Sequence, residues 1–256
     1  MIDARAIVSA RAELAPDVTV GAFSIIGPDV VIGPGTTIAS HTVINGPTHI
    51  GANNRIFSFA SLGDAPQDKK YAGEPTRLEI GDRNVFREFT TMNRGTTHDK
   101  GVTRIGNDNL FMAYSHVAHD CQLGDHIVFA NCATLGGHIE IGDWVTLGGL
   151  AAIHQFCKIG SHAFIAGGAI ITRDVPPYLT VAGNPSAPHS INAVGLERRG
   201  YTPEQVRNVR HAFKILYRSD LKLADAVAQL TGLGKTQPEV QAFVDFIGKS
   251  TRSLVR

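Results

Sequence analysis

Large apolar residues recur every six positions along most of this chain. The spacing is uninterrupted from residue 2 to residue 62, resumes in the same register after one gap, and continues to residue 171, shifted by one residue, after a second gap. An α-helix repeats every 3.6 residues and cannot hold a period of six on one face, so the pattern excludes helix here. The positions are Ile2, Val8, Leu14, Val20, Ile26, Ile32, Ile38, Ile44, Ile50, Ile56, Leu62, Ile80, Phe86, Met92, Ile105, Phe111, Val117, Leu123, Phe129, Leu135, Ile141, Leu147, Ile153, Ile159, Ile165 and Ile171.

Two companion positions repeat with the apolar one. Small or β-branched residues stand two places before it, as at Ala12, Ser24, Thr36, Ala60, Thr90, Ser115, Ala133, Ala151 and Ala169. Glycine often follows it directly, as at Gly21, Gly27, Gly33, Gly51, Gly81, Gly106, Gly124, Gly142, Gly148 and Gly160. Each hexad therefore predicts one short strand and one corner, with the large and small residues pointing inward and the glycine or a polar corner residue taking the backbone strain. Three hexads close a triangular coil, and coils stack about 4.8 Å apart.

The pattern resembles the hexapeptide repeat of left-handed parallel β-helices, and the handedness is taken from that resemblance because spacing alone does not determine it. The repeat ends near residue 176, and the prediction is an all-β left-handed parallel β-helix over residues 1–185 with a C-terminal α-helical domain over residues 186–256. Within that domain, a capping box at Thr202–Gln205 predicts the start of a helix whose apolar face contains Val206, Val209, Phe213 and Leu216. Two more helices are predicted over 221–230 and 236–247, the last opening with a capping box from Thr236 to Glu239.

The repeat is interrupted at about 63–79 and 93–104, each time after a residue on the second face of a coil. Both loops should therefore leave the β-helix at the same edge, and long loops on a rigid scaffold commonly carry function. Polar groups gather at that edge, since His119, Gly137 and Gln155 are spaced by one full coil and should stack within roughly 10 Å. The candidates at the edge are His116, His119, Asp120, Gly137, His138, His154 and Gln155. A prism side is not concave, so the loops or a neighbouring subunit must supply the other wall of a site, which favours a trimer.

Composition narrows the class of protein. A hydrophobic share of 43% with 18% charged residues is ordinary for a soluble globular chain, no apolar run could span a bilayer, and no signal peptide is expected. Three cysteines without CxxC spacing predict free thiols and a reducing, cytoplasmic location. Residues 186–256 carry 11 Lys and Arg against 6 Asp and Glu, which fits either an acidic partner or a solvated helix surface.

Several chemistries are disfavoured at the histidine edge. The spacing of His116, His119 and His138 does not match that of hexapeptide-repeat carbonic anhydrases, so no metal is expected. Cys121 and Cys157 occupy the inward small-residue position and are assigned to the core. Phosphate-loop and dinucleotide fingerprints are missing, and neither a cofactor nor a nucleic-acid partner is expected. Imidazole acting as a general base on a hydroxyl group remains, with a neighbouring carboxylate to orient it and a backbone N–H to stabilise an oxyanion.

Five segments carry a closer resemblance: QDKKYAGEPTRLEIGDRN (67–84), SHVAHDC (115–121), GGLAAIHQFCKIG (148–160), RDVPPY (173–178) and GLERRGY (195–201). They resemble the UDP-N-acetylglucosamine 3-O-acyltransferases, which begin lipid A biosynthesis in Gram-negative bacteria. The resemblance covers essentially the whole chain. It implies a cytoplasmic homotrimer without a cofactor that moves a (3R)-3-hydroxyacyl chain from the phosphopantetheine of acyl carrier protein to the 3-position of UDP-N-acetylglucosamine.

The resemblance also implies roles for individual residues. The general base falls on His119, its supporting acid on Asp120 and the oxyanion amide on Gly137. Residues matching the family's substrate contacts are Gln67, Asp68 and Lys70 in the first loop, with Lys70 reaching from the facing subunit, His116, His138, His154 and Gln155 along the edge, Gly167 at the acyl pocket, and Asn192, Arg198 and Arg199 at the uridine and phosphates.

The chain departs from the family at Val194, where many members have glutamate, and at Asn93, where many have histidine. Gly167 suggests room for a longer acyl chain, whereas Pro185 stands where some long-chain members have a ruler residue. Acyl length, and an oxygen or nitrogen acceptor as in a 3-amino UDP-sugar analogue, stay open. The alternatives are a related N-acyltransferase, which carries an additional N-terminal domain, an acetyl-CoA-dependent acetyltransferase, and a purely structural β-helix.

Overall fold

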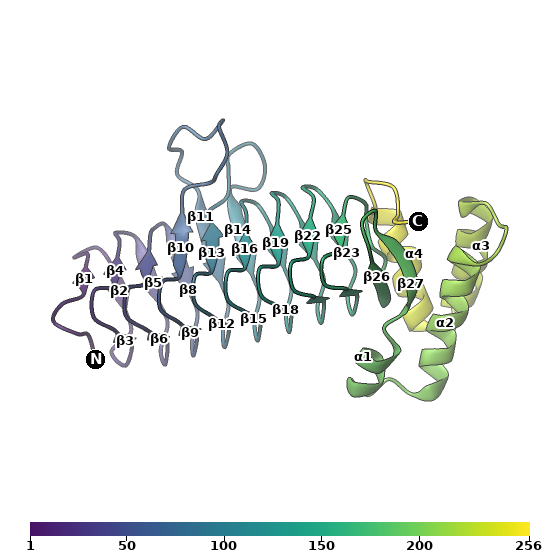
Figure 1. Cartoon of the computed structure of the whole chain (residues 1–256), viewed down its shortest axis with the longest axis horizontal. Coiled ribbons are helices and arrows are strands. Elements are labelled where there is room, and N and C mark those ends of the chain that lie inside the picture. The colour runs from purple at the N-terminus through teal and green to yellow at the C-terminus, as the bar shows by residue number, and fades with distance from the viewer.

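The computed structural model describes all 256 residues as a long three-sided prism of short strands followed by four helices (Figure 1). We number the faces in the order in which the chain reaches them, starting with the face of Ile2, which pairs with Val20. The first face contains β3 (Thr19–Val20), β6 (Thr37–Ile38), β9 (Arg55–Ile56), β12 (Val85–Phe86), β15 (Leu110–Phe111), β18 (Val128–Phe129), β21 (Thr146–Leu147), β24 (Phe164–Ile165), β26 (Leu179–Ala182) and β27 (Ala187–Ile191).

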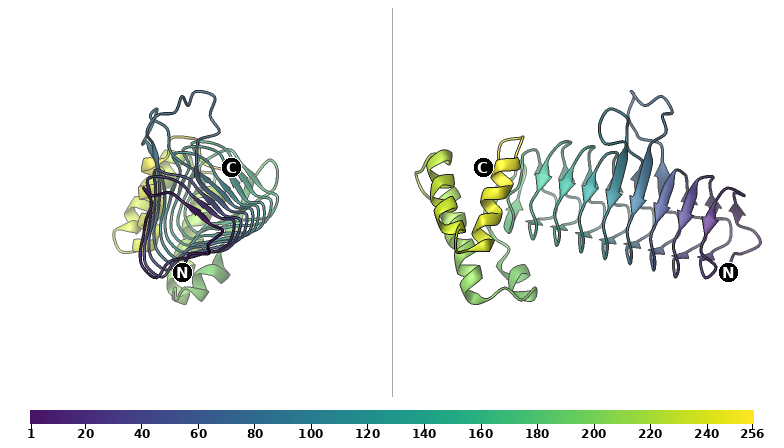
Figure 2. Two further views of the ribbon diagram at one scale, coloured as in Figure 1. Left: turned by 90° about the vertical axis from the view of Figure 1, so that its left-hand side faces the viewer. Right: turned by 180° about the vertical axis from the view of Figure 1, so that it is seen from behind.

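The second face contains β1 (Ile7–Val8), β4 (Ile25–Ile26), β7 (Val43–Ile44), β10 (Ser61–Asp64), β13 (Thr91–Asn93), β16 (His116–Val117), β19 (Thr134–Leu135), β22 (Ala152–Ile153) and β25 (Ile170–Ile171). The third contains β2 (Glu13–Leu14), β5 (Val30–Ile32), β8 (Thr48–Ile50), β11 (Arg77–Ile80), β14 (Val102–Ile105), β17 (Gln122–Leu123), β20 (Glu140–Ile141) and β23 (Lys158–Ile159). All strand pairs are parallel except that of β26 with β27, which is antiparallel. Because β27 belongs to the sheet of the first face, this sheet extends to residue 191. The end-on view in Figure 2 shows the triangular cross-section that the six-residue repeat predicts.

The repeat places its side chains as expected. The large apolar residues form one continuous column inside the prism, where Phe86 stacks on Phe111 and the tilted ring of Phe129 follows in the next coil. The small residues two places earlier are buried beside them from the second coil onward, for example Ser24 and Ala133. The N-terminal coil is open at its end, which leaves Ile2 exposed. Burial of this column supplies the main hydrophobic contribution to stability.

The corner glycines do not have the role that the sequence suggested. Backbone φ is positive at the third residue after the apolar one, and most of these residues are not glycine; Asp120 and His138 are examples. The glycine directly after the apolar residue is needed for another reason, as Gly33 illustrates. A Cβ atom there would lie 2.7 Å from the carbonyl carbon of Gly51 in the next coil. Glycine directly after the apolar residue thus permits close stacking of coils and does not carry the strain, whereas the expectation that a polar corner residue carries it holds at positions such as Asp120 and His138.

The helices are α1 (Ala193–Arg198), α2 (Pro203–Tyr217), α3 (Leu223–Gly234) and α4 (Pro238–Lys249). The capping box before α2 is confirmed, because the Thr202 hydroxyl accepts from Gln205 N and the Gln205 side chain accepts from Thr202 N. The second capping box was wrong: α4 starts at Pro238 without a side-chain cap, and the Glu239 carboxylate accepts from Asn208 Nδ2 of α2 instead. The short α1 was not predicted. None of the four helices has the length and apolar character needed to cross a bilayer.

Candidate active site

Both loops leave the prism at the edge between the second and third faces, as predicted (Figures 1 and 2). Residues 65–76 connect β10 to β11, and residues 94–101 connect β13 to β14. We call this edge the insertion edge. Because the parallel strands hold it at a fixed coil spacing, residues one coil apart in sequence meet there.

His119 and Asp120 form the centre of this edge. The His119 Nδ1 lies 2.9 Å from Asp120 Oδ2. Asp120 is fully buried, and its carboxylate also accepts from the N–H and the hydroxyl of Thr96 in the second loop, at 3.0 and 2.7 Å. Burial alone would raise the pKa of Asp120, but the hydrogen bonds from His119 and Thr96 outweigh it and lower the pKa. Because an ionised carboxylate only accepts, His119 donates to Asp120 through Nδ1, and in the neutral ring this leaves Nε2 as the acceptor.

Gly137 lies one coil beyond His119. A Cβ at position 137 would fall 2.6 Å from Cε1 and 2.7 Å from Nε2 of the His119 ring, so any side chain there would displace the ring. The backbone N–H of Gly137 donates to no protein acceptor, whereas the next amide, of His138, donates to the carbonyl of His119. A free N–H next to an imidazole nitrogen is the arrangement that can stabilise a developing oxyanion.

His138 completes a second histidine–carboxylate pair. Its Nδ1 lies 2.8 Å from Asp99 Oδ2 in the second loop, and its ring meets that of His119 edge-on at 4.8 Å. Its other face stacks on Phe156, one coil further along, at 4.4 Å. The ring therefore has one orientation, fixed from both sides.

The remaining predicted edge residues surround this pair. His116 bonds through Nδ1 to the hydroxyl of Thr91, and burial, aided by the charge of His119, lowers its pKa. Asp68 and Lys70 line a cleft of about 410 Å³ together with His138. The Lys70 N–H donates to the Asp68 carboxylate and lowers the pKa of Asp68.

Three other predicted residues lie around this cluster. His154 and Gln155 are exposed in the coil beyond Gly137, and the ring of His154 bonds to the Gln155 carbonyl. Gln67 is exposed at the start of the loop and makes no side-chain hydrogen bond. These three are therefore free to meet a ligand or a second subunit.

The C-terminus builds a part of this edge that was not predicted from the sequence. Asp174 is fully buried, and its carboxylate accepts from Lys158 N, the Ser250 hydroxyl, Thr251 N and Arg252 N at 2.6–3.1 Å. The tail is thereby held over the last coil, where Arg252 donates to the carbonyl of Gln155 at 2.9 Å. One signal was available, since Asp174 occupies the same position after the apolar residue as Asp120.

Four predicted residues lie on other edges. Gly167 is exposed at the edge where the first face turns into the second. The same edge carries a stacked row of exposed aromatic rings, which we call the aromatic row: Phe23, His41, Phe59, Phe89 and Tyr114.

Asn192, Arg198 and Arg199 belong to the start and end of α1, near the edge between the third and first faces. There Arg199 lies 5.2 Å over the ring of Trp144, and Asn192 donates to His162 O at 2.9 Å. Within one chain, these residues do not meet the insertion edge.

One trio of residues has donor atoms close enough to share a metal ion, namely His119, Asp120 and His138, within 4.8 Å of one another. Both Nδ1 atoms, however, already face a carboxylate oxygen. A structural zinc site uses four ligands, commonly cysteines and histidines, whereas this trio offers three and includes no cysteine. The trio therefore does not fit a structural zinc site. Cys121 and Cys157 are buried in the prism, which confirms their core assignment, and burial raises the pKa of these thiols to about 12 and about 11.

Comparison with known proteins agrees with the geometry. Residues 174–255 match the family model described as UDP N-acetylglucosamine O-acyltransferase, domain 2, and residues 11–46 and 103–137 match the bacterial transferase hexapeptide model. An acyl-[acyl-carrier-protein]–UDP-N-acetylglucosamine O-acyltransferase of Halorhodospira halophila is 55% identical over 100% of this chain and 99% of its own length. The chain belongs to this family. The corresponding protein of Herminiimonas arsenicoxydans is 51% identical over 100% of this chain and 99% of its own.

A solved UDP-N-acetylglucosamine acyltransferase structure from Francisella novicida superposes with a TM-score of 0.98, at 42% identity, over 100% of this chain and 94% of that one. The left-handed winding expected from the resemblance is therefore confirmed for this member of the acyltransferase family. The structure shows where the residues that depart from the family pattern lie. Asn93 is buried under the first loop and donates to Ala65 O, Val194 is exposed on α1, and Pro185 lies in the exposed turn between β26 and β27.

Proposed function

We propose that this protein transfers a (3R)-3-hydroxyacyl chain from acyl carrier protein to the 3-hydroxyl of UDP-N-acetylglucosamine, the first step of lipid A biosynthesis. The observation that carries the proposal is the His119 ring, oriented by the buried Asp120 and packed on Gly137, whose N–H is free. Relatives at 51–55% identity over the whole chain are named for transfer from acyl carrier protein to this sugar nucleotide.

The geometry suits a direct transfer. His119 Nε2 removes the proton of the sugar hydroxyl as its oxygen attacks the thioester carbonyl carbon. The carbonyl oxygen becomes an oxyanion, to which the Gly137 N–H donates. When the intermediate collapses, the C–O bond to the sugar is kept, the C–S bond breaks, and His119 returns its proton to the leaving sulfur. Asp120 stabilises the imidazolium throughout, and neither a metal nor a cofactor takes part.

We further propose that the site lies between subunits of a homotrimer. The residues assigned to the acyl chain, the reacting atoms and the nucleotide lie on three different edges of one prism, so a single chain cannot hold one substrate with all of them. A neighbouring copy that presents its Arg198 and Arg199 to the insertion edge completes the set. The exposed aromatic row, in which Tyr114 is 58% and Phe89 43% exposed, supports such packing, because a soluble chain rarely leaves a long apolar strip uncovered.

We also propose a location in the cell, on the evidence of the cysteines. All three cysteines are free thiols, which supports a reducing compartment, and we assign the enzyme to the cytoplasm. Asp68 is proposed to hold the sugar beside His119, together with a Lys70 that the resemblance assigns to the facing subunit, although Lys70 of the same chain also lines this cleft. Gly167 is proposed to leave the acyl path open for a long chain.

The test is an assay with a 3-hydroxyacyl carrier protein and UDP-N-acetylglucosamine, using a series of acyl lengths and acetyl-CoA as donors. Acylated sugar nucleotide should form only with the carrier-protein donors. His119→Ala should abolish turnover, whereas His211→Ala, on the exposed side of α2, should not. No product from the wild type, or equal rates for His119→Ala, would refute the proposal. Offering the 3-amino sugar in parallel decides between an oxygen and a nitrogen acceptor.

A further inference from the structure

The carboxylate of Asp99 lies in the second insertion loop and has no part in the transfer as proposed. Its Oδ2 lies 2.8 Å from Nδ1 of His138, within hydrogen-bond distance, whereas Asp120 Oδ2 stands 3.9 Å from the same nitrogen and is too far. Asp99 and His138 both line the cleft of about 410 Å³ at the insertion edge. The His138 side chain is 13% exposed and that of Asp99 36%, so the pair belongs to the wall of the cleft and not to open solvent.

The loop holds Asp99 in a fixed relation to the His119 centre. The N–H of Asp99 donates to the carbonyl of Thr96 at 3.4 Å, which bends the loop into a turn. The N–H and the hydroxyl of Thr96 donate in turn to the buried carboxylate of Asp120. One short loop therefore supports the acid that orients His119 and supplies the acid that bonds to His138.

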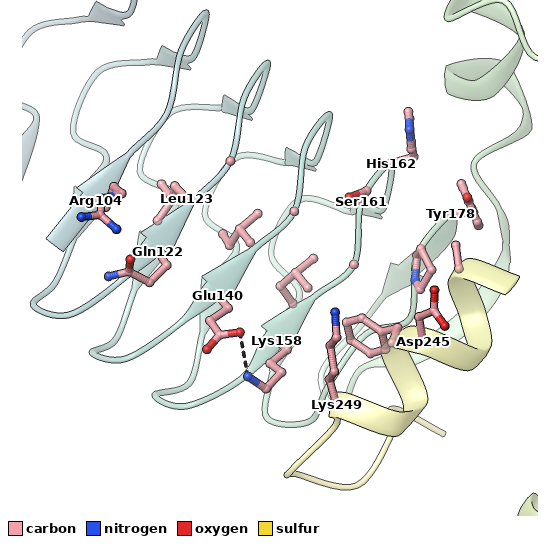
Figure 3. Close-up of a pocket in the computed structure, with 18 of the residues that line it drawn as sticks. Arg104, Gln122, Leu123, Glu140, Lys158, Ser161, His162, Tyr178, Asp245 and Lys249 are labelled. Atoms are coloured by element: carbon pink, nitrogen blue, oxygen red, sulfur yellow. Dashed lines mark ion pairs between the residues drawn. The ribbon is translucent and has the colours of Figure 1, made fainter. Parts of the chain in front are cut away.

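The loop is also attached on the far side of Asp99. Lys100 pairs with Glu140 of β20 at 3.2 Å, and Glu140 pairs with Lys158 of β23 at 2.7 Å; Figure 3 shows the second pair on the third face of the prism. Exposed ion pairs of this kind contribute little individually, but the bonds of Thr96 to a buried carboxylate are stronger. Removal of the Asp99 carboxylate therefore leaves the loop attached on both sides.

The bond to Asp99 determines which nitrogen of His138 carries the proton. Phe156 stacks on the ring at 4.4 Å and sets its plane, but stacking does not distinguish the two tautomers. A carboxylate only accepts, so Nδ1 donates to Asp99, and in the neutral ring Nε2 is then an acceptor. This Nε2 has no hydrogen-bond partner in the protein, and the His138 ring lies 4.8 Å from the ring of His119. An unused acceptor thus stands next to the proposed base.

We propose that Asp99 is a positioning residue for the sugar nucleotide: it keeps the ring proton of His138 on Nδ1, so that Nε2 accepts a hydrogen bond from a sugar hydroxyl other than the one that reacts. The inference rests on the proposed function and deepens it, because it names the group that makes His138 an acceptor. The reacting hydroxyl is assigned to His119, and the sugar carries further hydroxyls nearby. His138 exchanges no proton with the substrate, and its role is to fix the sugar relative to the base.

Removal of the carboxylate tests the role of Asp99. Asp99→Ala should raise the KM for UDP-N-acetylglucosamine about tenfold and lower kcat no more than about threefold, because one hydrogen bond to the sugar is lost while the base stays in place. The direction is informative, since loss of a negative charge beside an anionic nucleotide would by itself lower this KM. Thr97→Ala, at an exposed position in the same loop, is the matched control and should behave as wild type. An unchanged or lower KM for Asp99→Ala, or the same rise in both variants, would overturn the proposal.

A double-variant cycle tests whether Asp99 acts through the ring. His138→Ala should raise the same KM at least as much, and Asp99→Ala added to it should have no further effect. A second rise of about tenfold would mean that Asp99 contacts the sugar directly or only holds the loop, and the proposal would fail. If His138→Ala turns over too slowly, the cycle is measured as dissociation constants of the acylated sugar nucleotide by calorimetry, which needs no turnover.

Sugar analogues test the bonded group. Apart from the reacting hydroxyl, the sugar of UDP-N-acetylglucosamine has hydroxyls at positions 4 and 6. One of the two deoxy analogues should bind to wild type about tenfold more weakly and show the same KM with Asp99→Ala. If Asp99→Ala weakens both analogues as much as the parent compound, no sugar hydroxyl bonds to His138 and the inference is wrong. An inactive wild type refutes the proposed function, whereas an active wild type with an insensitive Asp99→Ala variant refutes only this inference.

Discussion

The imidazole of His119 rests directly on Gly137, one coil further along the prism. The closest approach of a Cβ at residue 137 would be 2.6 Å, to the ring carbon Cε1. The residue that is proposed to donate to the oxyanion is thus also the platform for the base. Both functions depend on a position that is two residues past a core leucine, where the stacking of coils sets the distance.

Gly137→Ala should therefore push the His119 ring away and lower kcat about 100-fold, since a displacement of about 1 Å is enough for such a loss. Thermal unfolding should change little, because the ring can swing outward. Gly149→Ala is the matched control: it stands at the same place in its hexad, and its Cβ would meet nothing closer than 3.4 Å. Equal losses in the two variants would contradict the role of the His119 contact.

Asp120→Asn should lower kcat by about 10² to 10⁴ and change the KM values little. The amide can no longer fix the proton on Nδ1 of His119, and it also loses one of the charge-assisted bonds to Thr96. Asp99→Asn, the equivalent change beside His138, should cost less, because that ring is also held by Phe156. The measurement is kcat of the two variants at saturating substrate, and an equal or larger loss for Asp99→Asn would contradict the role of Asp120.

Subunit mixing tests whether two chains build each site. His119→Ala and Arg199→Ala should each be nearly inactive alone, and trimers assembled at random from equal amounts should regain about 25% of wild-type activity, because one interface in four then has both intact residues. Mixed samples that stay inactive would show that both residues act from the same chain. The doubly substituted chain mixed with wild type gives the reference.

Asp174→Asn should lower the free energy of unfolding by about 2–4 kcal/mol, because three donors of the C-terminal tail lose a buried charged acceptor. Release of the tail should also raise the substrate KM values, since Thr251 lines the cleft and Arg252 holds the Gln155 carbonyl. Arg252→Ala separates the two effects: it should raise KM with little change in denaturant midpoint. An Asp174→Asn variant with wild-type kinetics would show that the tail is only structural.

The stability of the C-terminal part should fall in mild acid. Burial, aided by the nearby Arg199 guanidinium, lowers the pKa of His162 from 6.5 to about 4. Between those values the unfolded chain binds a proton that the folded chain does not, so the free energy of unfolding decreases as the pH falls from about 6.5 to about 4. His162→Phe, which keeps the stacking on Trp144 and Tyr178, should flatten this part of the profile. If the melting temperatures of wild type and variant fall by the same amount from pH 7 to pH 4, His162 is not the cause of the acid sensitivity.

Much of the fold was determined by local pattern. A six-residue period with a small residue two places earlier permits only one side of each short strand to face inward, so the three faces, the core column and the shared edge of both loops could be read from residues such as Leu62 and Met92. The stacking of His119, Gly137 and Gln155 followed from the same arithmetic, and the structure confirms it.

The contacts between distant segments were decided only by the tertiary structure. Thr96 meets Asp120, and Ser250 meets Asp174, across 24 and 76 residues, and no period links them. The second capping box failed for the same reason, because the Glu239 carboxylate found an amide on α2 and not its own helix start. A repeat fixes neighbours one coil away, since its geometry is the same in every turn. Where the chain leaves the repeat, tertiary packing and buried hydrogen bonds determine which residues meet, and these contacts cannot be predicted from sequence spacing.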